Sequence, residues 1–496
     1  MIERRGTAAN PVLRKFRHVT AKEVLSPQPP RPYPRPTMAG TTDLHSMRAE
    51  LGATLRLAAP LALANLLQMA VFSTDVMFVA RLGQESLAAA SLAVAIVAVL
   101  MMGMNGVTGA VAPLIAAELG RRFNAVREVR RSLRMALWLA LALGIFGIAL
   151  CALGERLMLA TGQDPKVAAI SGHFIRVLSI SMVPMALGNV LRTFVSALGR
   201  PVFATVITAF AILVNATGNY VLVFGHFGAP ALGLTGSAIS SIITASATVV
   251  AYVIAIRSDP RLRRFHPFGR WWRPEWQRLR QMLGLGLPIA GTLIAEGGLF
   301  SGAAFLMGRV GEAELAAHTV ALQIAAFAFQ VPFGIGQAAT IRVGYHYGAG
   351  DSVGIGRAGW SAIVIGLAFM CTSAGMMLLF PQLILSAYVD VTDPANAVLV
   401  GFALQYLFVA AIFQLTDGLQ AVAAGVLRGI QDTRVPMVIA IIGYWLAGFA
   451  TSAVLGLWTP LEGVGVWIGL AVGLTVAAAL LLARWHWRDR FAPVAA

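Results

Sequence analysis

The sequence predicts an all-α polytopic membrane protein with twelve transmembrane helices in two pseudo-symmetric six-helix lobes. Three observations predict this fold class: an apolar composition, an uneven distribution of Lys and Arg, and an internal repeat. The chain has 496 residues, of which 58% are hydrophobic and 12% are charged, and its mean hydropathy is +0.75. Charged residues make up about a quarter of an ordinary soluble domain, so most of this chain's surface is expected to face lipid.

Twelve segments are long and apolar enough to span a bilayer, which requires about 20 mostly apolar residues in a helix. They cover approximately residues 54–79, 87–116, 133–153, 170–196, 202–224, 234–256, 283–307, 315–340, 358–380, 396–426, 435–457 and 464–484. Several of them are long enough to tilt or kink.

The chain outside these segments divides the protein into parts. The expected parts are a disordered, basic and Pro-rich cytosolic tail (1–47), an N-lobe of helices 1 to 6 (48–257), a cytosolic amphipathic linker (258–282), a C-lobe of helices 7 to 12 (283–485) and a cytosolic tail (486–496). The linker contains Trp271, Trp272 and Trp276, which suit the headgroup region of a membrane.

The links between the segments alternate in charge. With the N-terminus in the cytosol, 33 of the 38 Lys and Arg residues fall on the cytosolic side and four on the outer side. This is the distribution that the positive-inside rule predicts for an even number of helices. The net charge of +16 is spread over many links and does not form one patch, so it does not indicate a nucleic-acid partner.

An internal repeat aligns the two halves of the chain at an offset of 228 residues. Pro60 matches Pro288 without a gap, and the same register pairs Gly106 with Gly334. Six helices separate the copies, so they share one orientation in the membrane. Parallel repeats of this kind predict two lobes with a substrate path between them. Pro60 and Pro288 are hinge candidates, because proline interrupts helix hydrogen bonding.

Three acidic residues lie well inside the predicted spans: Asp75 in helix 1, Glu296 in helix 7 and Asp417 in helix 10. An ionised Asp at a helix centre costs roughly 2.5–3.5 kcal/mol on insertion scales. No Lys or Arg is expected at the same depth. Desolvation favours the protonated form of such groups, so they are candidates for cation coupling, either as proton carriers or, for Glu296 and Asp417, as Na⁺ ligands. A structural role for any one of them is the alternative.

Amide and aromatic side chains accompany these acids. Asn215 and Asn219 lie at i and i+4 in helix 5 and share a face, where they are expected to line the lobe interior near Asp75 or to join helices. The remaining substrate-binding candidates are Phe413, Gln414 and Gln420, which surround Asp417, and Gln68, which is equivalent to Glu296 in the repeat. Phe413 suits an organic cation through a cation–π contact, although packing is its commoner role.

These stretches together resemble the multidrug and toxic compound extrusion (MATE) family, most closely its NorM-type branch. The stretches that carry the resemblance are "STDVMFVARLG", "NATGNYVLVFG", "LGLPIAGTLIAEGGLF" and "FQLTDGLQAVAAGVLRGIQDTRVP". The resemblance implies that Asp75 with Asn215 and Asn219 forms an N-lobe site, and Glu296 with Asp417 a C-lobe cation site. Some family members have a Tyr at the position of Phe413. The missing hydroxyl favours H⁺ over Na⁺ here.

The implied function is a multidrug efflux antiporter of the bacterial inner membrane. It exports cationic amphiphilic drugs in exchange for H⁺ or Na⁺ by alternating access, as a monomer with both termini in the cytoplasm. The alternative is a lipid-linked oligosaccharide flippase of the same superfamily, for which a more cationic cavity is expected. An enzyme, a bound cofactor and a dedicated metal site are not expected, because the spans contain no catalytic motif and the two Cys residues have no ligand spacing.

Overall fold

The structure, a computed structural model, describes residues 47–122, 125–269 and 272–491. Twelve helices in these ranges are long and apolar enough to cross a membrane, as the sequence predicts. Those of the N-lobe are α2 (Met47–Ala80), α3 (Gln84–Gly109) continued by α4 (Val111–Arg121), α5 (Ala125–Cys151), α7 (Pro165–Leu178) continued by α8 (Met182–Ala197), α9 (Val202–Phe224) and α10 (Gly233–Ser258). Residues 1–46 of the predicted tail, Trp271 and residues 492–496 lie outside the described residues.

The C-lobe follows the same order. Its spans are α12 (Trp276–Val310), α13 (Glu312–Ala349), α14 (Ser352–Leu379), α16 (Ala397–Gly429), α17 (Arg434–Ile441) with α18 (Ala450–Trp458), and α19 (Glu462–His486). A π-helical segment, Ile442–Phe449, joins α17 to α18 without a break in the span. Among the described residues, four short α-helices lie outside these spans: α6 (Gly154–Ala160), α11 (Pro260–Arg263), α15 (Pro381–Leu385) and α20 (Arg488–Phe491).

Local sequence sets several helix ends. Asp164 caps α7, where its Oδ1 accepts hydrogen bonds from the backbone N–H groups of Lys166 and Val167 at 2.9 and 3.2 Å. Gly350 ends α13 with φ at +70°, a left-handed conformation that glycine adopts without a side-chain clash. These short links return the chain directly into the next span.

Two hydrophobic cores hold the helices together. The larger core combines N-lobe residues with C-lobe residues from the second half of α13, from α14 and from the end of α16, including Ile335, Ile355 and Val426. The smaller core lies within the C-lobe and contains Ala321, from the first half of α13, with Leu407 and Trp467. The lobes therefore share a core at the end of α13 that the Lys and Arg distribution places in the cytosolic half.

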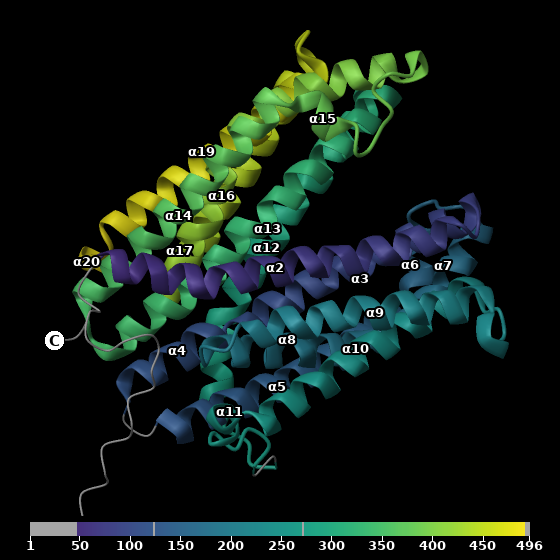
Figure 1. The fold of residues 1–496 in the computed structure, drawn as a ribbon. Coiled ribbons are helices and arrows are strands. Elements are labelled where there is room, and N and C mark those ends of the chain that lie inside the picture. The colour runs from purple at the N-terminus through teal and green to yellow at the C-terminus, as the bar shows by residue number, and fades with distance from the viewer. Residues whose placement is uncertain (1–46, 123–124, 270–271, 492–496) are drawn as a thin grey trace, which may run out of the picture. The chain divides into compact units, whose positions relative to one another are not determined.

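Matched helices meet at two seams between the lobes. Helix α2 packs against α13, and α3 packs against α12 (Figure 1). In the α3–α12 seam, a Cβ added to Gly106 would lie 2.6 Å from the backbone nitrogen of Ala290. In the α2–α13 seam, a Cβ added to Gly334 would lie 2.6 Å from the backbone nitrogen of Ala62. Both pairs are related by the 228-residue offset, so the repeat builds the same close contact twice.

The link between the lobes packs partly on the N-lobe. Leu262 in α11 and Phe265 after it are 0% and 2% exposed, and the Phe265 ring meets Phe194 edge-on at 6.4 Å between centroids. Trp272 and Trp276 are largely exposed, and Trp276 already begins α12. Helices α2 and α12 continue through Pro60 and Pro288, and the hinge role of these prolines stays a prediction.

We expect Gly106→Ala to lower the stability of the purified protein by about 1–3 kcal/mol, because the added methyl group overpacks against the α12 backbone. The thermal unfolding midpoint in detergent measures the loss. Gly109→Ala is the matched control on the same helix, since no atom lies within 4 Å of its added Cβ. Equal losses in the two variants would contradict a close seam at Gly106.

Candidate functional site

The N-lobe acid is surrounded by donors from two neighbouring helices. Asn215 and Asn219 of α9 donate through their Nδ2 atoms to Asp75 Oδ1 at 2.9 and 2.8 Å. Ser241 of α10 donates to Asp75 Oδ2 at 3.4 Å. Both Asn residues are buried, and Asn219 Nδ2 also donates to the Asn215 carbonyl at 3.0 Å. The i and i+4 spacing predicted from the sequence thus brings both amides to the same carboxylate.

The two C-lobe acids share one amide donor. Gln420 Nε2 donates to Glu296 Oε1 at 3.1 Å and to Asp417 Oδ1 at 3.3 Å. The hydroxyl of Tyr444, in the π-helical segment, donates to Gln420 Oε1 at 2.7 Å. Asp417, Gln420 and Tyr444 are all buried. Helices α12 and α16 therefore bring the two carboxyl groups together, and Tyr444 fixes the orientation of the amide between them.

Sequence reasoning missed Tyr444 and misplaced Arg428. Tyr444 lies in the run "IIGYWLAGF", where a single hydroxyl gives little signal. Arg428 was expected in a cytosolic link, below the depth of the acids, but its charge interacts with that of Glu296. A long Arg side chain extends well beyond the depth of its own backbone, so Arg428 lines the cavity between the lobes although the sequence predicts it in a cytosolic link.

Phe413 and Gln414 face the interior of the C-lobe. Each is 1% exposed. The Phe413 ring packs edge-on against Trp467 and Phe300, with centroids 5.6 and 6.4 Å apart. Ser373 donates to Gln414 Oε1 at 3.3 Å. In this conformation the two side chains pack and do not line the cavity between the lobes.

A group of polar atoms near Trp467 lacks protein partners. Both ring nitrogens of His318 are buried without a hydrogen bond among the described residues, and so are Tyr406 Oη and Trp467 Nε1. The rings of His318 and Tyr406 lie 5.5 and 6.1 Å from that of Trp467. Buried polar groups are nearly always satisfied by protein or water, so this part of the C-lobe is expected to hold ordered water.

A cavity of about 360 Å³ lies between the lobes. Its polar lining consists of amides, hydroxyls and two guanidinium groups, from Asn65, Gln68, Asn105, Asn189, Arg192, Thr193, Ser196, Gln330, Gln337, Thr340 and Arg428. No Asp or Glu among the described residues lines it. Of the residues predicted to bind substrate, the structure places only Gln68 on this cavity. The charged groups that line this cavity are positive, whereas the sequence predicts acidic groups inside the spans.

A buried ion pair joins the lobes at the predicted cytosolic end. Arg342 of α13 donates to Glu50 of α2 through Nε and Nη2, at 2.8 and 2.6 Å. Both side chains are at most 3% exposed. His346 adds a contact of 3.6 Å to Glu50 and one of 3.0 Å to Asp351. Because both guanidinium bonds reach one carboxylate, the pair holds α2 against α13 with defined geometry.

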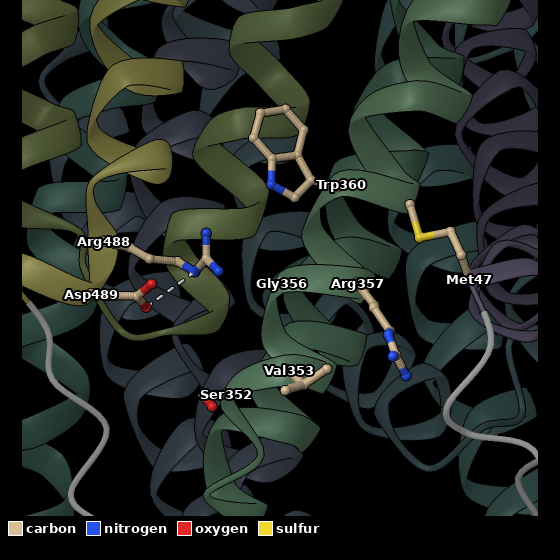
Figure 2. A pocket seen from close by; sticks show the side chains of 8 residues that line it. All are labelled: Met47, Ser352, Val353, Gly356, Arg357, Trp360, Arg488 and Asp489. Carbon is tan, nitrogen blue, oxygen red and sulfur yellow. Dashed lines mark ion pairs between the residues drawn. The ribbon is translucent and has the colours of Figure 1, made fainter.

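An open pocket of about 670 Å³ lies at the same end, away from the acids. The start of α14, the start of α2 and helix α20 line it (Figure 2). Figure 2 shows the 3.6 Å ion pair of Arg488 and Asp489 on one side of α14, and Arg357 on the side that faces Met47. The lining of this pocket contains both Arg and Trp, which are common at membrane interfaces.

Comparison with known sequences gives a consistent family. A family model described as MatE matches residues 60–221 and 288–454, one match in each lobe. A protein of Mesorhizobium japonicum named "Probable multidrug resistance protein NorM" is 44% identical over 446 residues, which cover 90% of this chain and 96% of the relative. A Burkholderia vietnamiensis protein named "Multidrug resistance protein NorM" is 37% identical, covering 87% of this chain and 93% of the relative.

Solved structures share the fold. A multidrug resistance MATE family transporter in an outward-facing conformation superposes with a TM-score of 0.80 at 21% identity, covering 91% of this chain and 99% of the other. A MOP superfamily transporter from Pyrococcus furiosus, described by the reverse polarity of its binding pocket, superposes with a TM-score of 0.78 at 21% identity. The match covers 91% of this chain and 98% of the other.

We expect Glu50→Gln to destabilise the protein by about 3–5 kcal/mol, because it leaves the Arg342 guanidinium buried without a counter-charge. Thermal unfolding of the purified protein in detergent checks this. Glu85→Gln is the matched control, since its ion pair with Lys166 is exposed to solvent and should contribute little. A loss for Glu50→Gln no larger than for Glu85→Gln would show that the buried pair does not hold the lobes together.

Proposed function

The chain belongs to the multidrug and toxic compound extrusion (MATE) family, a family of transporters and not of enzymes, and on this premise we propose that it is a secondary active antiporter. In this proposal it exports cationic amphiphilic compounds in exchange for an inward flow of cations. Relatives at about 40% identity named as multidrug resistance proteins favour drug export over the flippase alternative. Asp75, Glu296 and Asp417 are the proposed coupling residues.

The observation that carries the proposal is the single amide shared by Glu296 and Asp417. Two carboxylates within hydrogen-bond distance of one nitrogen repel each other when both are ionised, and the buried site offers little water to screen them. Binding of one cation relieves this repulsion. The site therefore has two states, occupied and vacant, which differ by a full charge in the lobe interior.

The groups around the C-lobe acids support H⁺ as the coupling ion. A hard metal cation binds several oxygen ligands at once. Here Gln420 presents its NH2 group to both carboxylates, and its oxygen is already bonded to Tyr444. Phe413 contributes no oxygen. A proton needs only one carboxylate oxygen, so it suits this arrangement better than Na⁺.

Asp75 forms a second exchange site in the N-lobe. Burial disfavours its ionised form, whereas the donors from Asn215, Asn219 and Ser241 favour it. These opposing effects leave the carboxylate able to change state with its surroundings. A proton and a cationic drug then compete for it. Such mutual exclusion gives each ligand a preference for a different state of the lobes, which coupling requires.

Alternating access in this proposal means separation of the lobes at one end at a time. The shared hydrophobic core and the Glu50–Arg342 pair close the end that we assign to the cytosol. The chain is a multi-pass membrane protein with bacterial relatives. We place it in the bacterial inner membrane as a monomer. We place both termini in the cytoplasm, because Lys and Arg gather in the links on that side.

We expect inside-out vesicles containing the protein to accumulate the cationic dye ethidium when an outward-directed H⁺ gradient is imposed, and not with a Na⁺ gradient alone. Asp417→Asn and Glu296→Gln should reduce gradient-driven uptake to the level of vesicles without the protein, because neither neutral side chain can be charged and discharged. Asp390→Asn, in an exposed link, is the control. Full uptake by Asp417→Asn would refute the coupling role.

We expect a membrane-impermeant maleimide added to intact cells to label Tyr388→Cys but not Arg264→Cys, in a Cys371→Ser background. Both positions are exposed in the structure, whereas Cys151 is buried. Tyr388 lies in a link assigned to the outside and Arg264 in the basic link assigned to the cytosol. After the cells are opened, both variants should react. The reverse pattern in intact cells would invert the proposed topology.

A further inference from the structure

The cavity between the lobes brings together two partly buried cations from opposite halves of the protein. Arg192 comes from α8 of the N-lobe and Arg428 from the end of α16 in the C-lobe, and both line the cavity. Within the described part of the chain, neither guanidinium has an ion pair with a carboxylate at hydrogen-bonding distance. The proposed exchange of cations on carboxylates does not use this pair.

The charges around the cavity do not balance. Arg192 donates to Asn65 Oδ1, a neutral acceptor, and the ionisable side chain beside it is Tyr252, which is uncharged at neutral pH. The Arg428 guanidinium has no hydrogen bond within the described ranges, and the charge it interacts with is that of Glu296. The cavity lining therefore contains two guanidinium groups and, among the described residues, no carboxylate. Burying an unpaired charge is costly, so this arrangement favours an anion in the cavity.

The rest of the lining suits the same kind of ligand. A guanidinium group presents a planar fork of N–H donors that fits the oxygen atoms of a carboxylate or phosphate. Neighbouring amides such as Gln68 and Gln337 can add neutral donors. On the apolar side, Met69, Phe72 and Phe333 can hold a hydrophobic body. A volume of about 360 Å³ accommodates a small amphiphile.

We propose that this cavity is an anion-binding site, in which Arg192 and Arg428 hold the carboxylate or phosphate group of an amphiphile between the two lobes. The site goes beyond the proposed exchange of cations, and it depends on that function only for whether the bound anion is carried. Because each lobe supplies one guanidinium, the ligand bridges the lobes. Binding therefore stabilises the arrangement in which both guanidinium groups line one cavity.

Binding of matched probes to the purified full chain in phosphatidylcholine nanodiscs tests the site. The probes are 2-naphthyl phosphate, 2-naphthoate and 2-naphthyltrimethylammonium, which share one ring system and differ in charge. Isothermal titration calorimetry measures their affinities without any ion gradient. We expect the two anions to bind and the cation to bind at least about tenfold more weakly, the difference that one charge-assisted hydrogen bond gives. Equal affinity for the three probes would overturn the proposal.

Variants assign the binding to the two guanidinium groups. Arg192→Gln and Arg428→Gln should each weaken binding of 2-naphthyl phosphate by about tenfold or more. Arg434→Gln, at an exposed position six residues beyond Arg428, is the matched control and should bind as the unaltered protein does. Arg192→Lys and Arg428→Lys keep the charge and guard against loss of folding; they should bind more tightly than the Gln variants. Equal losses in Arg434→Gln and Arg428→Gln would place the anion elsewhere and overturn the proposal.

A lipid headgroup and a soluble anion share this chemistry, and two further arms separate them. Nanodiscs of phosphatidylglycerol should compete with 2-naphthyl phosphate if an anionic headgroup reaches the cavity. Added inorganic phosphate should compete if a small soluble anion suffices. If phosphatidylglycerol or inorganic phosphate competes with 2-naphthyl phosphate in the unaltered protein and not in Arg428→Gln, the result supports the site. These measurements are independent of ion-driven dye uptake, so loss of anion binding and failure of the antiport function are distinguishable.

Discussion

A carboxylate in a membrane span needs hydrogen-bond donors from its own helix or from neighbouring helices, and the site's architecture follows from this constraint. Asp75 obtains its donors from α9 and α10, so these helices must pack against α2. Glu296 and Asp417 obtain theirs from one side chain, Gln420, which Tyr444 orients. The donors are neutral, so they stabilise the charge without cancelling it. A permanent ion pair would hold the carboxylates in one state, whereas amides leave them able to take up and release a cation.

Much of the fold and part of the site can be predicted from the sequence. The twelve spans follow from hydropathy, and the seam contacts of Gly106 and Gly334 follow the repeat because both halves use the same helices to meet. The i and i+4 spacing of Asn215 and Asn219 predicts their shared face, and the structure brings both amides to Asp75. Phe413 is different. Its neighbours in sequence suggest a binding surface, but the rotation of α16 turns its ring toward Trp467. Sequence spacing gives relative positions on one helix and not the direction that its face takes.

The depth of a basic side chain in the membrane is harder to predict from sequence than that of an acidic one. An Asp side chain is short, so its depth is close to that of its backbone. Arg428 lies at the end of α16, in a stretch that reads as a cytosolic link, yet its guanidinium reaches the cavity and interacts with Glu296. Arg192 behaves similarly in α8, where its partner is the amide of Asn65. The cavity between the lobes is therefore lined by cations and amides, while Asp75, Glu296 and Asp417 lie inside the lobes.

The glycine and alanine seams constrain the direction in which the lobes can move. At Gly106 and Gly334 the backbone of one helix touches the backbone of the next, so no flexible side chain lies between them to absorb a lengthwise shift. Sliding either helix past its partner would drive larger side chains into the contact, whereas drawing the two apart causes no such clash. Two equivalent seams, one on each side of the pseudo-symmetry axis, restrict translation in the same way. The seams thereby favour a relative tilt of the two halves over a lengthwise shift.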